Sequence, residues 1–137
     1  MKISLKLLLL AFISSAFLLV SCNDDSNDPS DDKNKIYDTW TRFVTEFDDT
    51  SFAARLVIKE NNTFEFIVVD NVPGHSNSSA TFHLSDGTME IIEDPDCESV
   101  GTYSYNVVED KLTLILVIDD CTARSKALSG VWNEYED

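Results

Sequence analysis

Basic residues are scarce in this chain of 137 residues, which has 10 Lys and Arg against 25 Asp and Glu and a formal net charge of −15. Nucleic acids and anionic membrane surfaces are also negatively charged, so they would repel a protein of this composition. We therefore expect no nucleic-acid partner. The excess of acids is explained by solubility and by mutual repulsion between copies of the protein, without a bound cation.

Glycine and histidine are also few, with four Gly and two His in the chain. The sequence contains no glycine-rich phosphate-binding loop, no Gly-x-Ser-x-Gly nucleophile elbow and no His-Glu-x-x-His zinc motif. The acids of Glu93 to Glu98 offer oxygen ligands of the kind that Ca²⁺ prefers, but their spacing matches no EF-hand loop. We expect a protein that is not an enzyme and has no metal or cofactor.

The longest apolar run is at the N-terminus. Leu7 to Val20 is apolar apart from Ser14 and Ser15, and it follows Lys2 and Lys6. This arrangement is typical of a secretory signal peptide. Fourteen helical residues would reach about 21 Å, short of the roughly 30 Å hydrocarbon core of a bilayer, so the run is a poor permanent transmembrane helix.

The leader ends at a cysteine. Leu19-Val20-Ser21-Cys22 is followed at once by the acidic Asn23-Asp24-Asp25. This site resembles the lipobox of bacterial lipoproteins, in which signal peptidase II cuts before a cysteine that carries a diacylglycerol on its sulfur. The alternatives are an ordinary signal peptide with a cysteine at its end and a short uncleaved anchor. The resemblance implies a signal peptide over residues 1–21 and attachment to the membrane through acyl chains on Cys22, several of which together make attachment stable.

A polar segment separates this cysteine from the rest of the chain. Asn23 to Lys35 has no aliphatic or aromatic residue and contains five Asp, so residues 22–35 are predicted to be a lipidated, disordered tether. The acids after Cys22 resemble the export signal of lipoproteins on the outer face of some Gram-negative outer membranes. The aspartate that retains some lipoproteins in the inner membrane is absent, because position 23 is Asn. We expect an outer-membrane lipoprotein displayed at the cell surface.

From Ala53 onward, apolar and polar residues alternate, and turn residues recur at short intervals. This pattern is typical of an antiparallel β domain. Three hairpins are predicted, with turns at Glu60-Asn61-Asn62, at Asp86-Gly87 and at Glu109-Asp110. The predicted inward-facing pairs are Ala54–Val68, Leu56–Phe66, Ile58–Phe64, Phe82–Ile91, Leu84–Met89, Tyr103–Leu116, Tyr105–Leu114 and Val107–Leu112.

Two further segments complete the domain. Apolar residues of Ile36 to Phe47 lie at helical spacing, but several of its residues are β-branched and disfavour helix. We interpret the segment as a strand, with a short N-terminal helix as the alternative, and we expect a last strand over Leu128 to Tyr135. The total is seven or eight strands, and the eighth would allow an up-and-down barrel to close without a bare edge.

Several short motifs together resemble the small lipocalin-like domains of bacterial lipoproteins. They are Trp40 near the start of the domain, the short hairpins, Gly101-Thr102-Tyr103, the run Asp119 to Arg124, and Gly130-Val131-Trp132. The resemblance covers residues 36–137 and implies an all-β antiparallel meander that forms a small barrel.

The resemblance also implies roles for two residues. In lipocalins a Gly-x-Trp motif opens the first strand, and an arginine late in the chain packs across its tryptophan. Trp40 and Arg124 are the matching residues here, although Asp38 stands in the place of the glycine. Without the resemblance, Arg124 would be a surface partner of Asp119 or Asp120.

Two cysteines, Cys97 and Cys121, remain once Cys22 is assigned to lipid. The register of the third hairpin places Cys97 opposite residue 122, and irregular backbone over residues 97–101 could absorb the offset of one residue. We therefore predict a disulfide, with two free thiols as the alternative. Closing a loop of about 25 residues stabilises a fold by roughly 3.5 kcal/mol in the chain-entropy model.

Two functions are compatible with these features. The first is a lipid-anchored, non-catalytic binding module whose interior holds a small apolar ligand against Phe64, Phe66, Phe82, Tyr103 and Tyr105. Such aromatic residues also fill small barrels completely. The second is an interaction or structural protein with a packed core, which binds an envelope or host protein through its outer surface or the polar loop Asn71 to Ser79. A continuous internal cavity would favour the first function.

Overall fold

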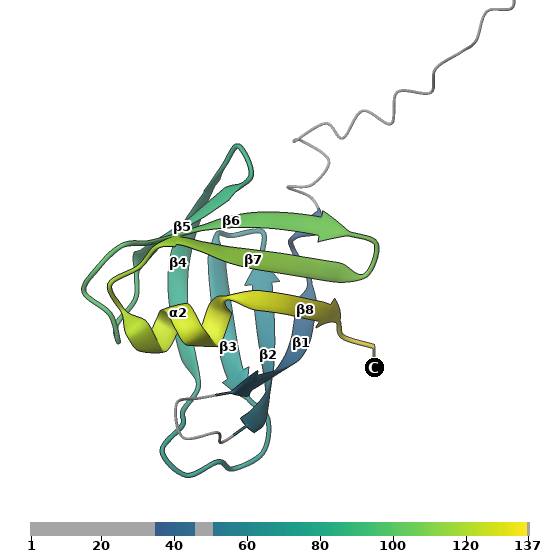
Figure 1. Ribbon diagram of the computed structural model, residues 1–137, viewed down its shortest axis with the longest axis vertical. Coiled ribbons are helices and arrows are strands. Elements are labelled where there is room, and N and C mark those ends of the chain that lie inside the picture. The colour runs from purple at the N-terminus through teal and green to yellow at the C-terminus, as the bar shows by residue number, and fades with distance from the viewer. Residues whose placement is uncertain (1–34, 46–50, 137) are drawn as a thin grey trace, which may run out of the picture.

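The computed structural model describes residues 35–45 and 51–136. The predicted signal peptide, the lipidated Cys22 and the tether as far as residue 34 lie outside the described residues. Within them, eight antiparallel strands follow one another around a barrel, and the first strand pairs with the last to close it (Figure 1). The prediction of a small lipocalin-like up-and-down barrel is confirmed.

The segment Ile36 to Phe47, in which helical spacing and β-branched residues conflict, forms a strand over Thr39–Thr45. Its residues 46 and 47 lie outside the described residues. Its described residues 36–45 contain no helix, so the strand interpretation is confirmed there. The strands are β1 (Thr39–Thr45), β2 (Ser51–Lys59), β3 (Thr63–Val68), β4 (Ser78–Ser85), β5 (Thr88–Glu93), β6 (Gly101–Val108), β7 (Lys111–Ile118) and β8 (Gly130–Glu134). A helix, α2 (Thr122–Leu128), lies between β7 and β8.

The three predicted hairpin registers are confirmed, and every predicted cross-strand pair is found. The turns need backbone with positive φ, which Asn62 (62°), Asp86 (43°), Gly87 (75°) and Glu109 (55°) provide. Glycine, Asn and Asp reach this region most easily, so Glu109 is the less usual residue there. Local turn chemistry therefore determines the registers of the three hairpins.

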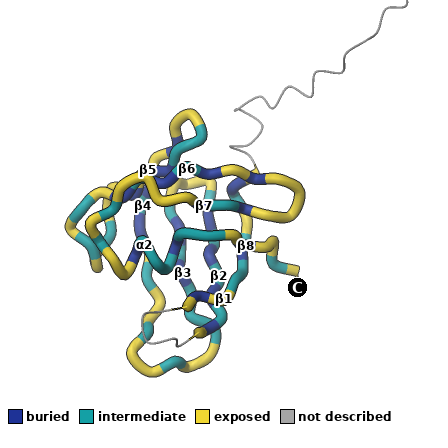
Figure 2. The backbone as a smooth tube through the Cα atoms, in the orientation of Figure 1, coloured by how far each residue is buried: buried dark blue, intermediate teal, exposed yellow. Residues whose placement is uncertain are grey.

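One apolar core fills the barrel, and buried residues alternate with partly buried or exposed ones along most strands (Figure 2). Its largest fully buried side chains include Trp40 on β1 and Trp132 on β8. Leu116 is an exception on the predicted inner face, since its side chain is 43% exposed. The reason is that β8 pairs with β7 only as far as Leu114, which leaves the end of β7 uncovered on that side.

The helix α2 was not predicted, and the expected strand from Leu128 is wrong at its start. Leu128 is the last residue of α2, and β8 begins at Gly130. The helix has only seven residues, too few for an apolar periodicity to be recognised. Arg124 and Leu128, four positions apart, share the face that is buried against the barrel.

Side chains from the barrel hold the C-terminal end of α2. The indole N–H of Trp132 donates to the carbonyl of Leu128 at 2.9 Å, and Arg42 on β1 donates to the carbonyls of Lys126, at 3.1 Å, and of Ser129. These bonds satisfy carbonyl groups that a helix end leaves unpaired. Gly130 has a φ of 133°, a backbone conformation that favours glycine, and a Cβ there would force the Arg42 guanidinium to shift.

The strand connections are divided between the two ends of the barrel. The three tight hairpin turns lie at the end where the described chain enters β1. Of the described connections, three longer ones lie at the opposite end: residues 69–77 between β3 and β4, residues 94–100 between β5 and β6, and the segment with α2 between β7 and β8. We call this second end the mouth of the barrel.

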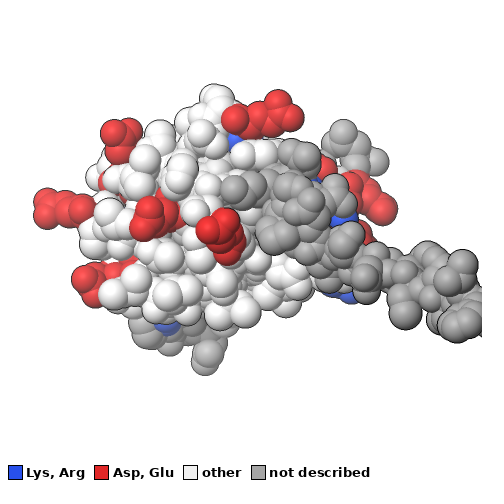
Figure 3. Space-filling view, turned by 90° about the horizontal axis from the view of Figure 1, so that it is seen from above, with Lys and Arg blue, Asp and Glu red and all other residues white. Residues whose placement is uncertain are grey.

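Acidic side chains are spread over the surface. On the face shown in Figure 3, Asp and Glu stand apart from one another, with few Lys or Arg between them. This distribution fits the interpretation that the acids confer solubility, because no single cluster dominates that face.

Candidate functional site

A cleft of about 330 Å³ opens at the mouth, between α2, the 69–77 connection and the 94–100 connection. We call it the mouth cleft. Its volume is at the lower end of the range of about 300 to 1,000 Å³ that is usual for ligand sites. Its inner wall is apolar and its rim is polar. The wall includes Phe52, Phe64, Phe66, Val68, Ala127 and Leu128, and the rim includes His75, Ser76, Ser78, Asp94 and Asp96.

The residues predicted to line a ligand site separate into two groups. Phe64 and Phe66 line the mouth cleft, whereas Phe82, Tyr103 and Tyr105 belong to the packed core and do not line it. The rings of Phe64 and Phe82 pack with their centroids 6.4 Å apart. The ring of Phe66 meets Trp132 edge-on at 6.4 Å. Core packing therefore takes up Phe82, Tyr103 and Tyr105, and of the five predicted residues only Phe64 and Phe66 reach the cleft.

A second, larger groove of about 530 Å³ lies outside the barrel. Thr63, Thr81, Glu93 and Glu98 are among its lining residues. Hydroxyl and carboxylate groups of this kind are well solvated at an open surface. The mouth cleft, with its phenylalanine wall, is therefore the better candidate for an apolar ligand.

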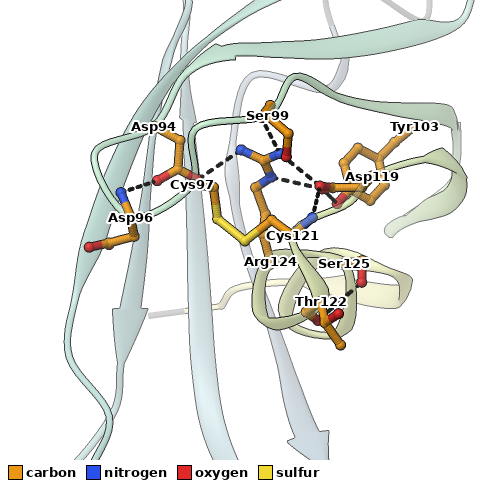
Figure 4. A network of polar contacts seen from close by, with 10 residues as sticks. All are labelled: Asp94, Asp96, Cys97, Ser99, Tyr103, Asp119, Cys121, Thr122, Arg124 and Ser125. Atoms are coloured by element: carbon orange, nitrogen blue, oxygen red, sulfur yellow. Dashed lines mark hydrogen bonds and ion pairs between the residues drawn. A yellow bond between two sulfur atoms is a disulfide. The ribbon is translucent and has the colours of Figure 1, made fainter.

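Arg124 of α2 forms the centre of a polar network beside the cleft (Figure 4). Its Nε and Nη2 donate to the two carboxylate oxygens of Asp119, at 2.7 and 2.8 Å. Its Nη1 donates to Asp94 at 3.1 Å, and Nη2 also donates to the carbonyl of Ser99 at 2.6 Å. Arg124 is only 5% exposed. One side chain thus joins α2 to the end of β7 and to the 94–100 connection.

The carboxylate of Asp119 is fully buried, with 0% of its side chain exposed. Burial alone would raise its pKa, but hydrogen bonds from Arg124, from the Tyr103 hydroxyl and from the Cys121 amide outweigh burial and lower the pKa. Burial, together with the hydrogen bond to Asp119, raises the pKa of Tyr103. The hydrogen bonds to Asp119 raise the pKa of Arg124, so the pair stays charged.

Gly101, the first residue of β6, lies against this network. A Cβ at this position would overlap the Asp119 carboxylate and come within 2.9 Å of Arg124 Nη2. The glycine of the Gly101-Thr102-Tyr103 motif is therefore required by close packing of a buried ion pair.

The predicted disulfide between Cys97 and Cys121 is confirmed, with the Cα atoms 5.9 Å apart. The observed pairing of β6 with β7 does not remove the predicted offset of one residue between the two cysteines. Thr102 pairs with Ile118 and Tyr103 with Leu116, so Val117 is an extra residue in β7 that moves the cysteines further out of register. The irregular 94–100 connection absorbs the difference. The disulfide links the N-terminal end of α2 to the 94–100 connection, and Arg124 links the same two segments.

Among the described residues, no hydrogen bond or cation–π contact joins Arg124 to Trp40. The indole N–H of Trp40 donates to the carbonyl of Ile36 at 3.0 Å, while Arg124 is bonded to Asp119. The arginine that lies over a tryptophan is Arg42, whose Cζ is 4.9 Å from the ring centroid of Trp132. The interpretation of Arg124 as a surface partner of Asp119 is correct about the partner. It is wrong about the surface, because Arg124 is buried.

His75 is a rim residue that sequence reasoning placed only in a solvated loop. Its ring is half-buried and lies 4.4 Å from the ring of Phe52, tilted by 36°. The connection folds back on itself, because the His75 amide donates to Val72 at 3.2 Å and Asn77 accepts from the Val68 amide at 2.9 Å. The partly buried Val72, an apolar residue within a polar loop, was the available signal.

Other kinds of site are less well supported. Among residues 35–45 and 51–136, no group of three or more His, Cys, Asp or Glu side chains is arranged to hold a metal ion. Asp94, within the acidic run considered for Ca²⁺, bonds to Arg124. None of the helices in the described part of the chain is both long enough and apolar enough to cross a membrane.

No model of a known protein family matches the chain, and no curated protein is significantly similar to it.

Proposed function

We propose that this protein is a lipid-anchored envelope lipoprotein whose barrel is a non-catalytic binding module, with the mouth cleft as its site for a small apolar ligand. The observation that carries the proposal is the phenylalanine wall of the cleft, formed by Phe52, Phe64 and Phe66 beside a cleft of about 330 Å³. An aromatic wall with a few polar groups at its rim is typical of small-molecule sites.

The position of the cleft supports this function. The described chain enters β1 at the end of the barrel with the tight turns, and the mouth is at the other end. If Cys22 carries lipid, the tether joins the barrel at the end remote from the cleft. A ligand then reaches the cleft without competition from the membrane for the same face.

Filling the cleft tests the proposal. Ala127 lies on α2 in the wall of the cleft, so Ala127→Trp should occupy the space that a ligand needs. We expect indole, a neutral apolar probe, to shift the NMR signals of Phe64 and Leu128 in the parent protein and not in this variant. Thr113→Trp on β7, which is outside the cleft, is the matched control and should bind indole normally. Equal binding of indole by both variants would contradict the proposal.

One observation favours the alternative of an interaction protein. The last four residues of β7, Ile115 to Ile118, are all apolar and exposed, from 43% at Leu116 to 62% at Ile118. β6 pairs with β7 as far as Ile118, whereas β8 stops at Leu114. An exposed apolar strand segment with one uncovered side can pair with another protein. A photo-crosslinker at Val117 should then capture an envelope or host protein in cells, and a crosslinker at His83 should not.

A further inference from the structure

The fixed charges around the mouth cleft are predominantly negative. The connection that forms one side of the rim, with the last residue of β5, contains Glu93, Asp94, Asp96 and Glu98 and no basic residue. Asp94 and Asp96 line the cleft directly, and Asp96 is exposed. A cleft with acidic groups at its rim and low-dielectric walls concentrates the field that attracts cations.

Arg124, which also lines the cleft, does not reverse this charge. Four donor positions of its guanidinium bond to protein oxygens, on Asp119, Asp94 and Ser99. Its side chain is only 4% exposed. The carboxylates of Asp119 and Asp94 thus face one guanidinium, so these three groups together carry a net charge of −1. Asp96 adds a further negative charge. An anionic ligand would have to compete with carboxylates that already hold this arginine.

The Asp94 carboxylate is held in a defined orientation at the rim. It accepts from Arg124 Nη1 at 3.1 Å and from the Asp96 amide at 2.9 Å. A carboxylate has about four acceptor positions, so Asp94 can also accept from the N–H of a ligand. The Phe52 ring, whose centroid is 4.4 Å from that of His75, also lines the cleft, and phenylalanine rings attract cations.

We infer that the mouth cleft selects a small apolar ligand that carries a positive charge, such as an aromatic or aliphatic amine, over neutral or anionic ligands of the same shape. The apolar part packs against the Phe64 and Phe66 wall, and the ammonium group lies at the rim by Asp94 and Asp96. This inference rests on the proposed function, because it assigns a ligand class to the same cleft.

Three probes with one shape and different charge test it: tryptamine, a cation at pH 7; tryptophol, which is neutral; and indole-3-propionate, an anion. Affinities would be measured by calorimetry at low ionic strength, and NMR would report binding at Phe64 and Leu128. We expect tryptamine to bind about tenfold more tightly than tryptophol, and indole-3-propionate to bind most weakly. Added salt should reduce the difference between the probes.

Two matched variants separate a local effect of the rim from the acidity of the whole chain. Asp96→Asn should reduce the preference for tryptamine about threefold or more and leave tryptophol affinity unchanged. Asp86→Asn removes the same charge from a hairpin turn at the other end of the barrel, and it should leave the preference unchanged.

The other outcomes separate a failure of the charge selectivity from a failure of the proposed function. If tryptophol binds in the cleft and tryptamine binds no more tightly, the charge selectivity is wrong and the proposed function stands. If both variants reduce the preference equally, the selectivity is not a property of the rim and the inference is wrong. If none of the three probes binds in the cleft, the inference fails together with the proposed function.

Discussion

At the scale of single residues, Arg124 and Asp119 organise the mouth more than any apolar side chain there. Each charge is removed from water, which is costly unless partners replace the lost hydration. The partners come from three separate segments of the chain: the end of β7, the 94–100 connection and Tyr103 of β6. Removing one member leaves the others buried with too few partners, so we expect the network to be intolerant of single substitutions.

The lowered pKa of Asp119 gives this expectation a pH dependence. A carboxylate whose pKa is lower in the folded state stabilises the fold fully above its unfolded value, about 3.9, and loses that contribution as the pH falls through the folded value. Asp119→Asn should therefore lower the free energy of unfolding by about 3 kcal/mol at pH 7. The difference from the parent protein should become smaller at pH 3 and below.

Urea unfolding followed by tryptophan fluorescence across this pH range would measure the difference. Asp120→Asn is the matched control, since Asp120 is the exposed neighbour of Asp119. The control should change stability little at any pH. A constant difference between parent and Asp119→Asn from pH 7 to pH 2 would contradict the assignment.

At the scale of elements, α2 is the one that shapes the mouth. Its buried face carries Arg124 and Leu128, and its C-terminal end is held by Arg42 and Trp132 from the two strands that close the barrel. The disulfide at Cys121 holds its N-terminal end to the 94–100 connection. A seven-residue helix is not stable by itself, so these contacts account for its presence.

Removal of the disulfide should weaken this element first. We expect Cys97→Ser with Cys121→Ser to lower the free energy of unfolding by roughly 3.5 kcal/mol or less, from loop entropy. Hydrogen exchange should increase most in α2 and residues 94–100, and less in the three tight hairpins. Urea unfolding and exchange measured by NMR test both points. Reduction of the parent protein should reproduce the effect, and a parent equally stable in both redox states would contradict it.

At the scale of the whole molecule, the two ends of the barrel have different roles. Tight turns and the start of β1 lie at one end, and the longer connections, the disulfide and the mouth cleft lie at the other. If Cys22 carries lipid, as proposed, the chain that leads from it joins the barrel at the end opposite the cleft.

Attachment to the membrane is tested at Cys22. We expect Cys22→Ser to prevent acylation, so that labelled palmitate is not incorporated and the protein is lost from the outer-membrane fraction. The variant that lacks Cys97 and Cys121 is the control, because it loses two cysteines and keeps Cys22. Its labelling should equal that of the parent protein. Membrane recovery of Cys22→Ser at the parent level would contradict lipid anchoring.

The sequence alone was sufficient for the elements that depend on local chemistry. Alternation identified most of the strands, the turn residues determined three registers, and the third register predicted that Cys97 and Cys121 lie near each other. These features involve residues within one hairpin or just beyond it, so their geometry follows from the two-residue period of a strand and the conformations that each turn allows.

The tertiary structure alone decided the rest. The partners of Arg124, the helix α2, the uncovered end of β7 and the separation of Phe64 and Phe66 from the packed aromatic core all depend on segments that are far apart in the chain. Side-chain volume decides whether a barrel interior is filled, and three-dimensional proximity decides which charges compensate one another. Neither has a periodicity that a linear sequence displays, so the mouth cleft became visible only in the closed barrel.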